Sequence, residues 1–360
     1  MKKYVRSEIT AMQGYVSGEQ PQGDEVVKLN TNENSYRASE RVYEAIRQAA
    51  ERGLARYPDP LGKAVRQEAA KLFGVDPESI LCGNGSDDLL TILVRTFVGR
   101  GELIRMAYPS YILYETLAEI QGAFCEKISF NADWTLPKRF EENPSDGFQG
   151  RENNLRLVFL ANPNSPSGTL IPKEKIREIA ERLPCPLVVD EAYADFTDEN
   201  CIDLVPKCEK IIVCRTLSKS YALAGLRFGF LVASPRLVEQ MLKVKDSYNC
   251  DALSIVAAAA ALGDQDWLKE NRRKVLATRA RLQKRMRKLG FDVPHSHANF
   301  TWNTRSDRPV QPIYAFLKER GFLVRYMNFP GWSDGLRISV GTDEQNDRCV
   351  DLIEEFLDRT

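Results

Sequence analysis

Histidine is nearly absent from this chain, and its cysteines show none of the spacings of a metal or redox site. The two histidines, His295 and His297, form an H-x-H arrangement with no third histidine anywhere in the sequence. A zinc site needs three or four protein ligands, so we expect no bound metal. The eight cysteines are scattered, without a C-x-x-C pair: Cys82, Cys125, Cys185, Cys201, Cys208, Cys214, Cys250 and Cys349. We expect small core residues in a reducing compartment, which favours the cytoplasm.

The chain also lacks a net charge and a long apolar run. It has 50 Lys and Arg residues against 50 Asp and Glu residues, so a broad basic surface for nucleic acid is not expected. The most apolar stretch, residues 255–262, is much shorter than a membrane span. Near the N-terminus, no apolar segment follows Lys2 and Lys3 within residues 1–20, so we expect no secretion signal.

Short apolar runs alternate with amphipathic segments between residues 60 and 235. The apolar runs lack in–out alternation, as expected for strands that are buried on both faces of a mostly parallel sheet. One intervening helix is predicted to begin at Pro172 and to place Ile176 and Ile179 on a single face. This order predicts an α/β fold with helices on both faces of a central sheet. The predicted strands are residues 79–83, 102–107, 155–161, 186–190, 210–216 and 227–234.

The pattern changes after residue 235. A long charged helical segment, from Trp267 to Leu289, leads into another helix and a short strand pair near Leu323 and Leu336. We interpret this region as a smaller α+β domain that the long helix joins to the sheet domain. The polar segment 131–154 is expected at the surface. The predicted division is an N-terminal segment that joins the small domain or a dimer contact (1–30), a large domain (31–250) and a small C-terminal domain that includes the linking helix (251–360).

Polar residues follow the predicted strands where the strands end, and these ends are where open parallel sheets bind ligands. The first strand is followed by residues 84–88 (NGSDD) at the start of a helix, where free N–H groups suit a phosphate. The later strand ends supply an amide, a carboxylate with a tyrosine, and a lysine with two hydroxyls and an arginine. These residues are Asn162, Asp190, Tyr193, Thr216, Ser218, Lys219 and Arg227.

Each of these residues has an ordinary structural explanation when it is taken alone. Asp190 could cap a helix, Lys219 could be a solvated charge, and Arg227 could form a weak surface ion pair. Together they match pyridoxal 5′-phosphate (PLP), which needs an amine for its aldehyde and a carboxylate at its ring nitrogen. PLP also needs donors to its phenolic oxygen and an anion site for its phosphate. We therefore predict that Lys219 holds PLP as a Schiff base, with burial lowering the pKa of its amine.

Longer motifs carry a resemblance to a known family along nearly the whole chain. They are LNTNEN (29–34), RYPDP (56–60), GNGSDD (83–88), YPSYILY (108–114), NPNSPSG (162–168), VVDEAYADF (188–196), TLSKSYALAGLRFG (216–229) and LRISVGT (336–342). In these motifs the chain resembles the histidinol-phosphate aminotransferases, within the fold-type I PLP-dependent aminotransferases. The resemblance implies a large domain with a mostly parallel sheet between helices, and a smaller α+β domain. It also implies that histidinol phosphate and 2-oxoglutarate are interconverted with imidazole-acetol phosphate and glutamate in histidine biosynthesis.

The resemblance implies roles for individual residues as well. Lys219 would hold the cofactor and move the proton at the substrate's Cα, with Asp190 at the ring nitrogen and Tyr193 at the phenolic oxygen. Further cofactor contacts are implied for Gly85, Ser86, Asp87, Tyr111, Asn162, Thr216, Ser218 and Arg227, and for Tyr57 from the other subunit of a homodimer. Substrate contacts are implied for Arg337, Arg325, Tyr15, Asn34 and Tyr248.

Four residues depart from the family pattern near the expected substrate pocket. Gly14, Ser35 and Ser247 stand where proline is usual, and Tyr326 stands where aspartate is common. These departures concern the substrate pocket and leave the predicted cofactor contacts unchanged. An aromatic amino-acid aminotransferase and a PLP-dependent decarboxylase similar to threonine-phosphate decarboxylase stay open as alternatives. A PLP-binding regulator and an NAD-dependent oxidoreductase are disfavoured, because we find neither a basic DNA-binding module nor a third glycine after residues 83–85.

Overall fold

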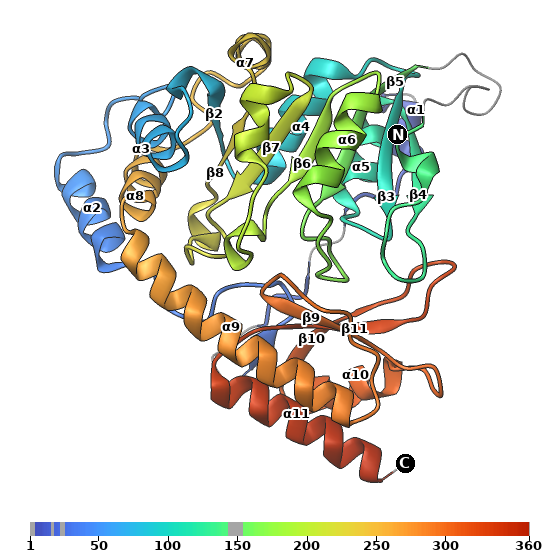
Figure 1. Cartoon of the computed structure of the whole chain (residues 1–360). Helices are drawn as coiled ribbons and strands as arrows, with labels where there is room; N and C mark the ends of the chain where they lie inside the picture. Colours follow the sequence, from blue (N-terminus) through green and yellow to red (C-terminus); the bar gives the residue numbers. More distant parts are fainter. Residues whose placement is uncertain (1–3, 16–17, 22–25, 143–153, 360) are drawn as a thin grey trace.

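The computed structural model of this protein describes residues 4–15, 18–21, 26–142 and 154–359, and these fold around two β-sheets (Figure 1). The larger sheet has the strand order β2-β8-β7-β6-β5-β3-β4, and the smaller sheet has the order β1-β10-β11-β9. The strands are β1 (Val27–Leu29), β2 (Ile80–Gly83), β3 (Leu103–Tyr108), β4 (Phe124–Ser129), β5 (Leu155–Ala161), β6 (Leu187–Asp190), β7 (Ile211–Thr216), β8 (Gly229–Val232), β9 (Phe300–Thr304), β10 (Phe322–Met327) and β11 (Gly335–Ser339). The α-helices are α1 (Ser7–Ala11), α2 (Glu40–Glu51), α3 (Lys63–Phe73), α4 (Ser86–Phe97), α5 (Leu113–Gln121), α6 (Lys173–Arg182), α7 (Pro235–Leu242), α8 (Ala252–Leu262), α9 (Gln265–Lys288), α10 (Gln311–Glu319) and α11 (Asp343–Asp358).

The larger sheet is mostly parallel, which confirms the predicted fold class. Strands β4, β3, β5, β6 and β7 pair in parallel, whereas β8 runs antiparallel to both β7 and β2. The six predicted strands of this sheet all occur, but β4 was missed. β4 lies at the edge of the sheet and carries Glu126 and Lys127, so its sequence lacks the continuous apolar run that served to predict the buried strands.

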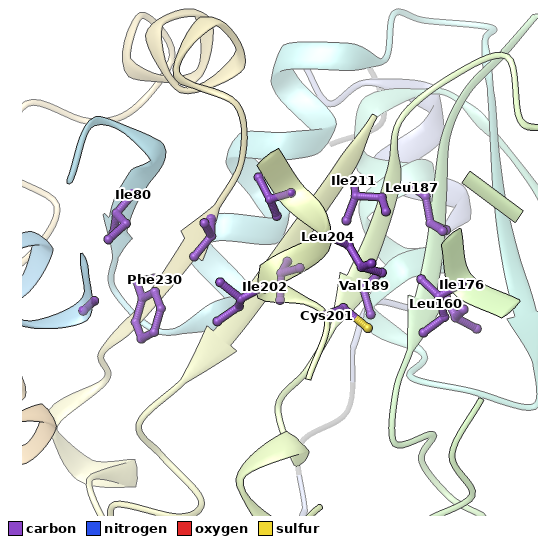
Figure 2. Close-up of a cluster of buried hydrophobic side chains, with 14 of the residues drawn as sticks. Ile80, Leu160, Ile176, Leu187, Val189, Cys201, Ile202, Leu204, Ile211 and Phe230 are labelled. Atoms are coloured by element: carbon purple, nitrogen blue, oxygen red, sulfur yellow. The ribbon is translucent and has the colours of Figure 1, made fainter. Parts of the chain in front are cut away.

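The large sheet is buried on both faces. In β5, Leu157 and Phe159 belong to one hydrophobic cluster while Val158 and Leu160 belong to another, because successive side chains point to opposite faces. Figure 2 shows part of the second cluster, which includes Val189, Ile211 and Phe230 from the strands and, on one side, Ile176 of α6 beside Leu160 of β5. The apolar face predicted for this helix is therefore in the core.

Helix α6 begins one residue later than predicted. Pro172 occupies the N-cap position with an extended backbone (ψ 141°), and Lys173 is the first helical residue. Proline has no N–H to donate, so either position at the start of the helix suits it.

The smaller sheet packs on α9, α10 and α11 and has a core of its own. Its buried residues include Met286 of α9, Ile313 of α10, Ile338 of β11 and Ile353 of α11. Helix α9 runs from the side of the large sheet to the small one (Figure 1) and corresponds to the predicted linking helix. β1, far away in sequence, pairs in parallel with β10. The N-terminal strand therefore completes the small sheet.

Parts of two predicted segments lie outside the described residues. These are residues 1–3, 16–17 and 22–25 of the N-terminal segment, and residues 143–153 of the surface segment. The domain boundaries at 30/31 and 250/251 stay a prediction. Among the helices that the structure describes, none combines the length and the hydropathy needed to cross a membrane.

Candidate active site

A cavity of about 340 Å³ opens where the parallel strands of the large sheet end, facing the small sheet. Asp190 is the last residue of β6, Thr216 is the last residue of β7, and Ser86 is the first residue of α4. All three line the cavity, together with Arg325 of β10 and Arg337 of β11 from the other side. The cavity is therefore at the ligand position of an open parallel sheet.

Lys219 lies three residues beyond β7 and lines this cavity. Its Nζ donates a hydrogen bond of 2.8 Å to the backbone oxygen of Thr31. Burial lowers the pKa of the amine to about 8, and the positive charge of Arg337 adds to this effect. At pH 7 about one amine in ten is then unprotonated, compared with about one in three thousand for a solvated lysine. Lys219 is thus half-buried beside the cation Arg337, and its attachment to the cofactor stays a prediction.

Asp190 is a buried carboxylate whose hydrogen bonds come from neutral groups. It is 5% exposed, and its oxygens accept hydrogen bonds from the Tyr114 hydroxyl at 2.6 Å and from the backbone N–H of Ala192 at 3.2 Å. Burial raises its pKa to about 6. Within the described ranges no lysine or arginine forms an ion pair with it, so a cation bound in the cavity would relieve the cost of burying its charge.

Tyr114 was not recognised from the sequence, although it ends the YPSYILY motif. It is fully buried, and its ring stacks on Phe159 with centroids 4.6 Å apart. We expect Tyr114→Phe to weaken PLP binding by about 10- to 100-fold, because it removes a hydrogen bond to a charged group. Titrating cofactor-free protein with PLP measures this. Tyr108→Phe, which removes a hydroxyl bonded to the backbone of Pro330, is the matched control. Equal affinities for both variants would contradict the expected role.

An anion site lies at the start of α4. Arg227 donates to the hydroxyl of Ser218 at 3.3 Å and pairs with Asp87 at 3.3 Å, while Thr216 donates to Ser218 at 3.0 Å. A Cβ on Gly85 would come within 2.7 Å of the Arg227 guanidinium, so only glycine allows this approach. The N-terminus of a helix, hydroxyls and an arginine together suit a phosphate.

Three tyrosines line the cavity between these groups. Tyr111 is bonded through its hydroxyl to Asp87 at 3.2 Å, and its ring lies edge-on to that of Tyr15, which also lines the cavity. The hydroxyl of Tyr193 accepts a 2.9 Å hydrogen bond from Asn32. Because Tyr193 is the acceptor in this bond, its own O–H is not used in it and can donate to another group.

Arg325 and Arg337 are directly opposite each other across the antiparallel pair β10–β11, and both line the cavity. Arg337 donates to the Ser165 hydroxyl at 2.9 Å and to the Asn30 backbone oxygen at 3.1 Å. Burial and the charge of Arg325 lower the pKa of Arg337. Like charges opposite each other are destabilising, so this pair favours binding of an anion.

Several predicted site residues do not line the cavity of this chain. The Asn162 side chain accepts from the Ile171 N–H at 2.7 Å and donates to the Ile171 oxygen at 3.1 Å, and Ser165 of the same motif lines the cavity instead. Asn34 supports the loop around Lys219 by bonding its backbone oxygen at 3.1 Å. Tyr57 is 81% exposed and stacks on Tyr248. Gly85 has no side chain to line the cavity, and the absence of a Cβ leaves room for the Arg227 guanidinium. Cofactor or substrate contacts of Asn162, Asn34, Tyr57 and Tyr248 stay predictions.

The two histidines lie elsewhere. His295 and His297 line a separate groove with Asp292 and Lys175, and their ring centroids are 4.7 Å apart. In the part of the chain that the structure describes, no three His, Cys, Asp or Glu side chains gather as metal ligands.

The residues present fit PLP. The buried carboxylate of Asp190 suits a protonated ring nitrogen, the amine of Lys219 suits an aldehyde, and the Arg227 site suits a phosphate. Nε of Arg337 is buried and has no hydrogen-bond partner in the described chain. Each of these groups would gain a partner if the cofactor and an anionic substrate were bound here.

Comparisons with known proteins identify the family. The model of the family "Aminotransferase class I and II" matches residues 24–353. A histidinol-phosphate aminotransferase of Rhodopirellula baltica is 54% identical over 98% of this chain and 95% of its own length. Another, from Trichormus variabilis, is 42% identical over 99% of this chain and 100% of its own length. A crystal structure of histidinol-phosphate aminotransferase from Sinorhizobium meliloti, in complex with pyridoxal-5′-phosphate, has a TM-score of 0.89, with 26% identity, and covers 99% of this chain and 98% of that one.

These matches run the length of the chain and agree with the amine, carboxylate and anion sites of the cavity. The chain therefore belongs to the class I and II aminotransferases, which use PLP, and within them to the histidinol-phosphate aminotransferases.

Proposed function

We propose that this chain transfers an amino group between histidinol phosphate and 2-oxoglutarate, forming imidazole-acetol phosphate and glutamate in histidine biosynthesis. The observation that carries the proposal is one cavity that contains the amine of Lys219, the buried carboxylate of Asp190 and two facing arginines. The first two residues suit PLP, and the arginines suit a substrate with a phosphate or carboxylate group. The curated relatives that match nearly the whole chain support this substrate.

PLP, when bound, supplies an electron sink for the negative charge that develops at the substrate's Cα. In the proposal, Asp190 keeps the ring nitrogen protonated, Tyr193 donates to the phenolic oxygen and Tyr111 packs on the ring. Lys219 holds the aldehyde between turnovers and accepts the proton that leaves Cα. Its low pKa supports this role, because the amine must be neutral to accept a proton. The phosphate is assigned to Gly85, Ser86, Asp87, Thr216, Ser218 and Arg227.

We assign the acid group of the substrate to Arg337 and Arg325. Arg337→Lys keeps the charge but loses the planar fork, so we expect KM for histidinol phosphate or glutamate to rise about 10- to 100-fold. Separate half-reactions with the two amino donors identify the substrate concerned. Arg273→Gln, on the exposed side of α9, is the control. If both half-reactions of Arg337→Lys keep wild-type KM values, the assignment is wrong.

We further propose that the chain acts as a homodimer in the cytoplasm, with Tyr57 reaching the phosphate in the partner's active site. The stacked pair Tyr57–Tyr248 is on the surface, with 81% and 48% of the side chains exposed, and Leu54 beside Tyr57 in the sequence is 58% exposed. Exposed aromatic and aliphatic side chains favour burial against another subunit. Tyr15, Asn34 and Tyr248 are assigned to the substrate side of the site.

The half-reactions test the proposed function. PLP-loaded protein is mixed with histidinol phosphate alone or with glutamate alone, and the visible absorption of the cofactor is followed together with the keto product. Each amino donor should decrease the visible absorption of the cofactor. Glutamate should release its keto acid, and histidinol phosphate should release its ketone. No response to histidinol phosphate, with a fast response to aromatic amino acids, would reassign the enzyme to those substrates. Carbon dioxide release from threonine phosphate would instead identify a decarboxylase.

A further inference from the structure

Asn32, in the segment after β1, links the small sheet to the active site. It is 1% exposed, and its side-chain amide donates a 2.9 Å hydrogen bond to the hydroxyl of Tyr193. Its backbone is in the left-handed region, with φ 56°, and its carbonyl accepts a 3.0 Å hydrogen bond from Asn299. Asparagine tolerates this conformation better than most residues. The side chain is therefore held in place from several directions.

The direction of the Asn32–Tyr193 hydrogen bond is set by Ser339 of β11. The hydroxyl of Ser339 accepts the backbone N–H of Asn32 at 2.9 Å and donates to Oδ1 of Asn32 at 3.1 Å. The amide oxygen therefore faces Ser339, and the amide NH₂ faces Tyr193. Because Tyr193 accepts this bond, its own proton is free to point into the cavity. The Tyr193 ring is held edge-on against Phe300, with centroids 5.0 Å apart.

We infer that Asn32 is a positioning residue that aims the O–H of Tyr193 at the phenolic oxygen of the cofactor. This inference rests on the proposed function, in which Tyr193 is that donor. Ser339 is two residues after Arg337 on β11, so the strand that carries the substrate-binding arginine also carries the residue that orients Asn32. The other charged or titratable groups that face Tyr193 are Arg337 from β11, Asp190 from β6 and Tyr15 from the N-terminal segment.

The pH dependence of the cofactor's visible absorption reports this contact without any turnover. With the cofactor attached, Nζ of Lys219 would take up a proton as the pH falls, and a negative phenolic oxygen of the cofactor would stabilise that proton. A donor to the phenolic oxygen withdraws this charge and lowers the pH midpoint. Removing the donor should therefore raise the midpoint, which a residue with only a structural role would not do.

The deciding variant is Asn32→Asp, which keeps the size of the side chain but offers only acceptor atoms to Tyr193. The tyrosine proton would then point to the new carboxylate and away from the cavity. We expect the midpoint to rise by about half a unit to one unit, the equivalent of one neutral hydrogen bond. Asn32→Gly, which tolerates the positive φ, should give a smaller rise in the same direction. Asn303→Asp is the matched control, because Asn303 is equally buried but bonds only within the small sheet.

A double variant separates positioning from a general structural effect. In a Tyr193→Phe background there is no hydroxyl to orient, so adding Asn32→Asp should shift the midpoint only through its new charge, and by less than it does when Tyr193 is present. The inference is overturned if Asn32→Asp leaves the midpoint unchanged, or if it shifts the midpoint equally in the Tyr193→Phe background. Wild-type protein that takes up no PLP would refute the proposed function itself, and the two failures are therefore distinguishable.

Discussion

Lys219→Ala is expected to reduce transamination by at least about four orders of magnitude, because one residue supplies both the covalent attachment and the proton transfer. The environment of Lys219 is what makes the reaction feasible in the wild type. Burial and Arg337 lower the pKa of its amine to about 8, which a surface lysine does not share. The same environment should let the variant bind PLP without a covalent bond, because Asp190 and the Arg227 site are unchanged.

Borohydride reduction followed by peptide mass spectrometry checks whether the cofactor is covalently attached to Lys219. The wild type should carry the cofactor on Lys219, and the variant should release it on denaturation. Lys207→Ala is the control, since Lys207 is an exposed lysine that pairs with Asp203 on the surface. Turnover by Lys219→Ala within tenfold of the wild type would rule out the assigned role.

Asp190→Asn should have opposite effects on activity and on the stability of the cofactor-free protein. Removing one member of a buried ion pair costs about 3–5 kcal/mol, so we expect kcat/KM to fall by about a hundred- to a few thousandfold. In the cofactor-free protein the carboxylate has no cation in the described residues, and burial raises its pKa from 3.8 to about 6. A folded-state pKa above the unfolded value means that the folded state binds the proton more tightly.

The part of the free energy of unfolding that depends on this proton is fully present below about pH 4. It is lost as the pH rises to about 6. The loss amounts to about 3 kcal/mol at neutral pH, and asparagine avoids it because it carries no charge. Urea unfolding of both cofactor-free proteins between pH 4 and 7 should show the variant gaining stability relative to the wild type as pH rises. Adding PLP should shrink or reverse that gain. A stability difference that does not vary with pH would contradict this account, and Asp203→Asn on the surface is the control.

Local patterns were sufficient to predict most of the large sheet and the groups at its strand ends. The strands β2, β3, β5, β6, β7 and β8 are apolar runs, and the order of strands along the chain places Asp190 and Lys219 at the same edge. β4 escaped prediction because its edge position permits charged residues, and β1 and β9 are too short or too polar to stand out. The predicted start of α6 was within one residue, and both predicted ends of α9 were within two residues.

Choosing between neighbouring residues of one motif needed the tertiary structure. The amide of Asn162 is bonded to the backbone of Ile171 and Ser165 lines the cavity and contacts Arg337, while the predicted contact of Asn162 with the cofactor stays a prediction. The NPNSPSG turn does not itself say which polar side chain faces the ligand, because that depends on the backbone path. Tyr114 was also missed, because its partner Asp190 is 76 positions away.

The sequence by itself determined the α/β fold, the PLP chemistry and the family, because each rests on residues that are close together or in a fixed order along the chain. Tertiary structure alone decided that Arg325 faces Arg337, that the carboxylate of Asp190 is bonded by the Tyr114 hydroxyl, and that Asn32 reaches Tyr193. These contacts join β1, β6, β10 and β11, which only sheet pairing and packing bring together. The low pKa of Lys219 likewise comes from burial among such distant groups.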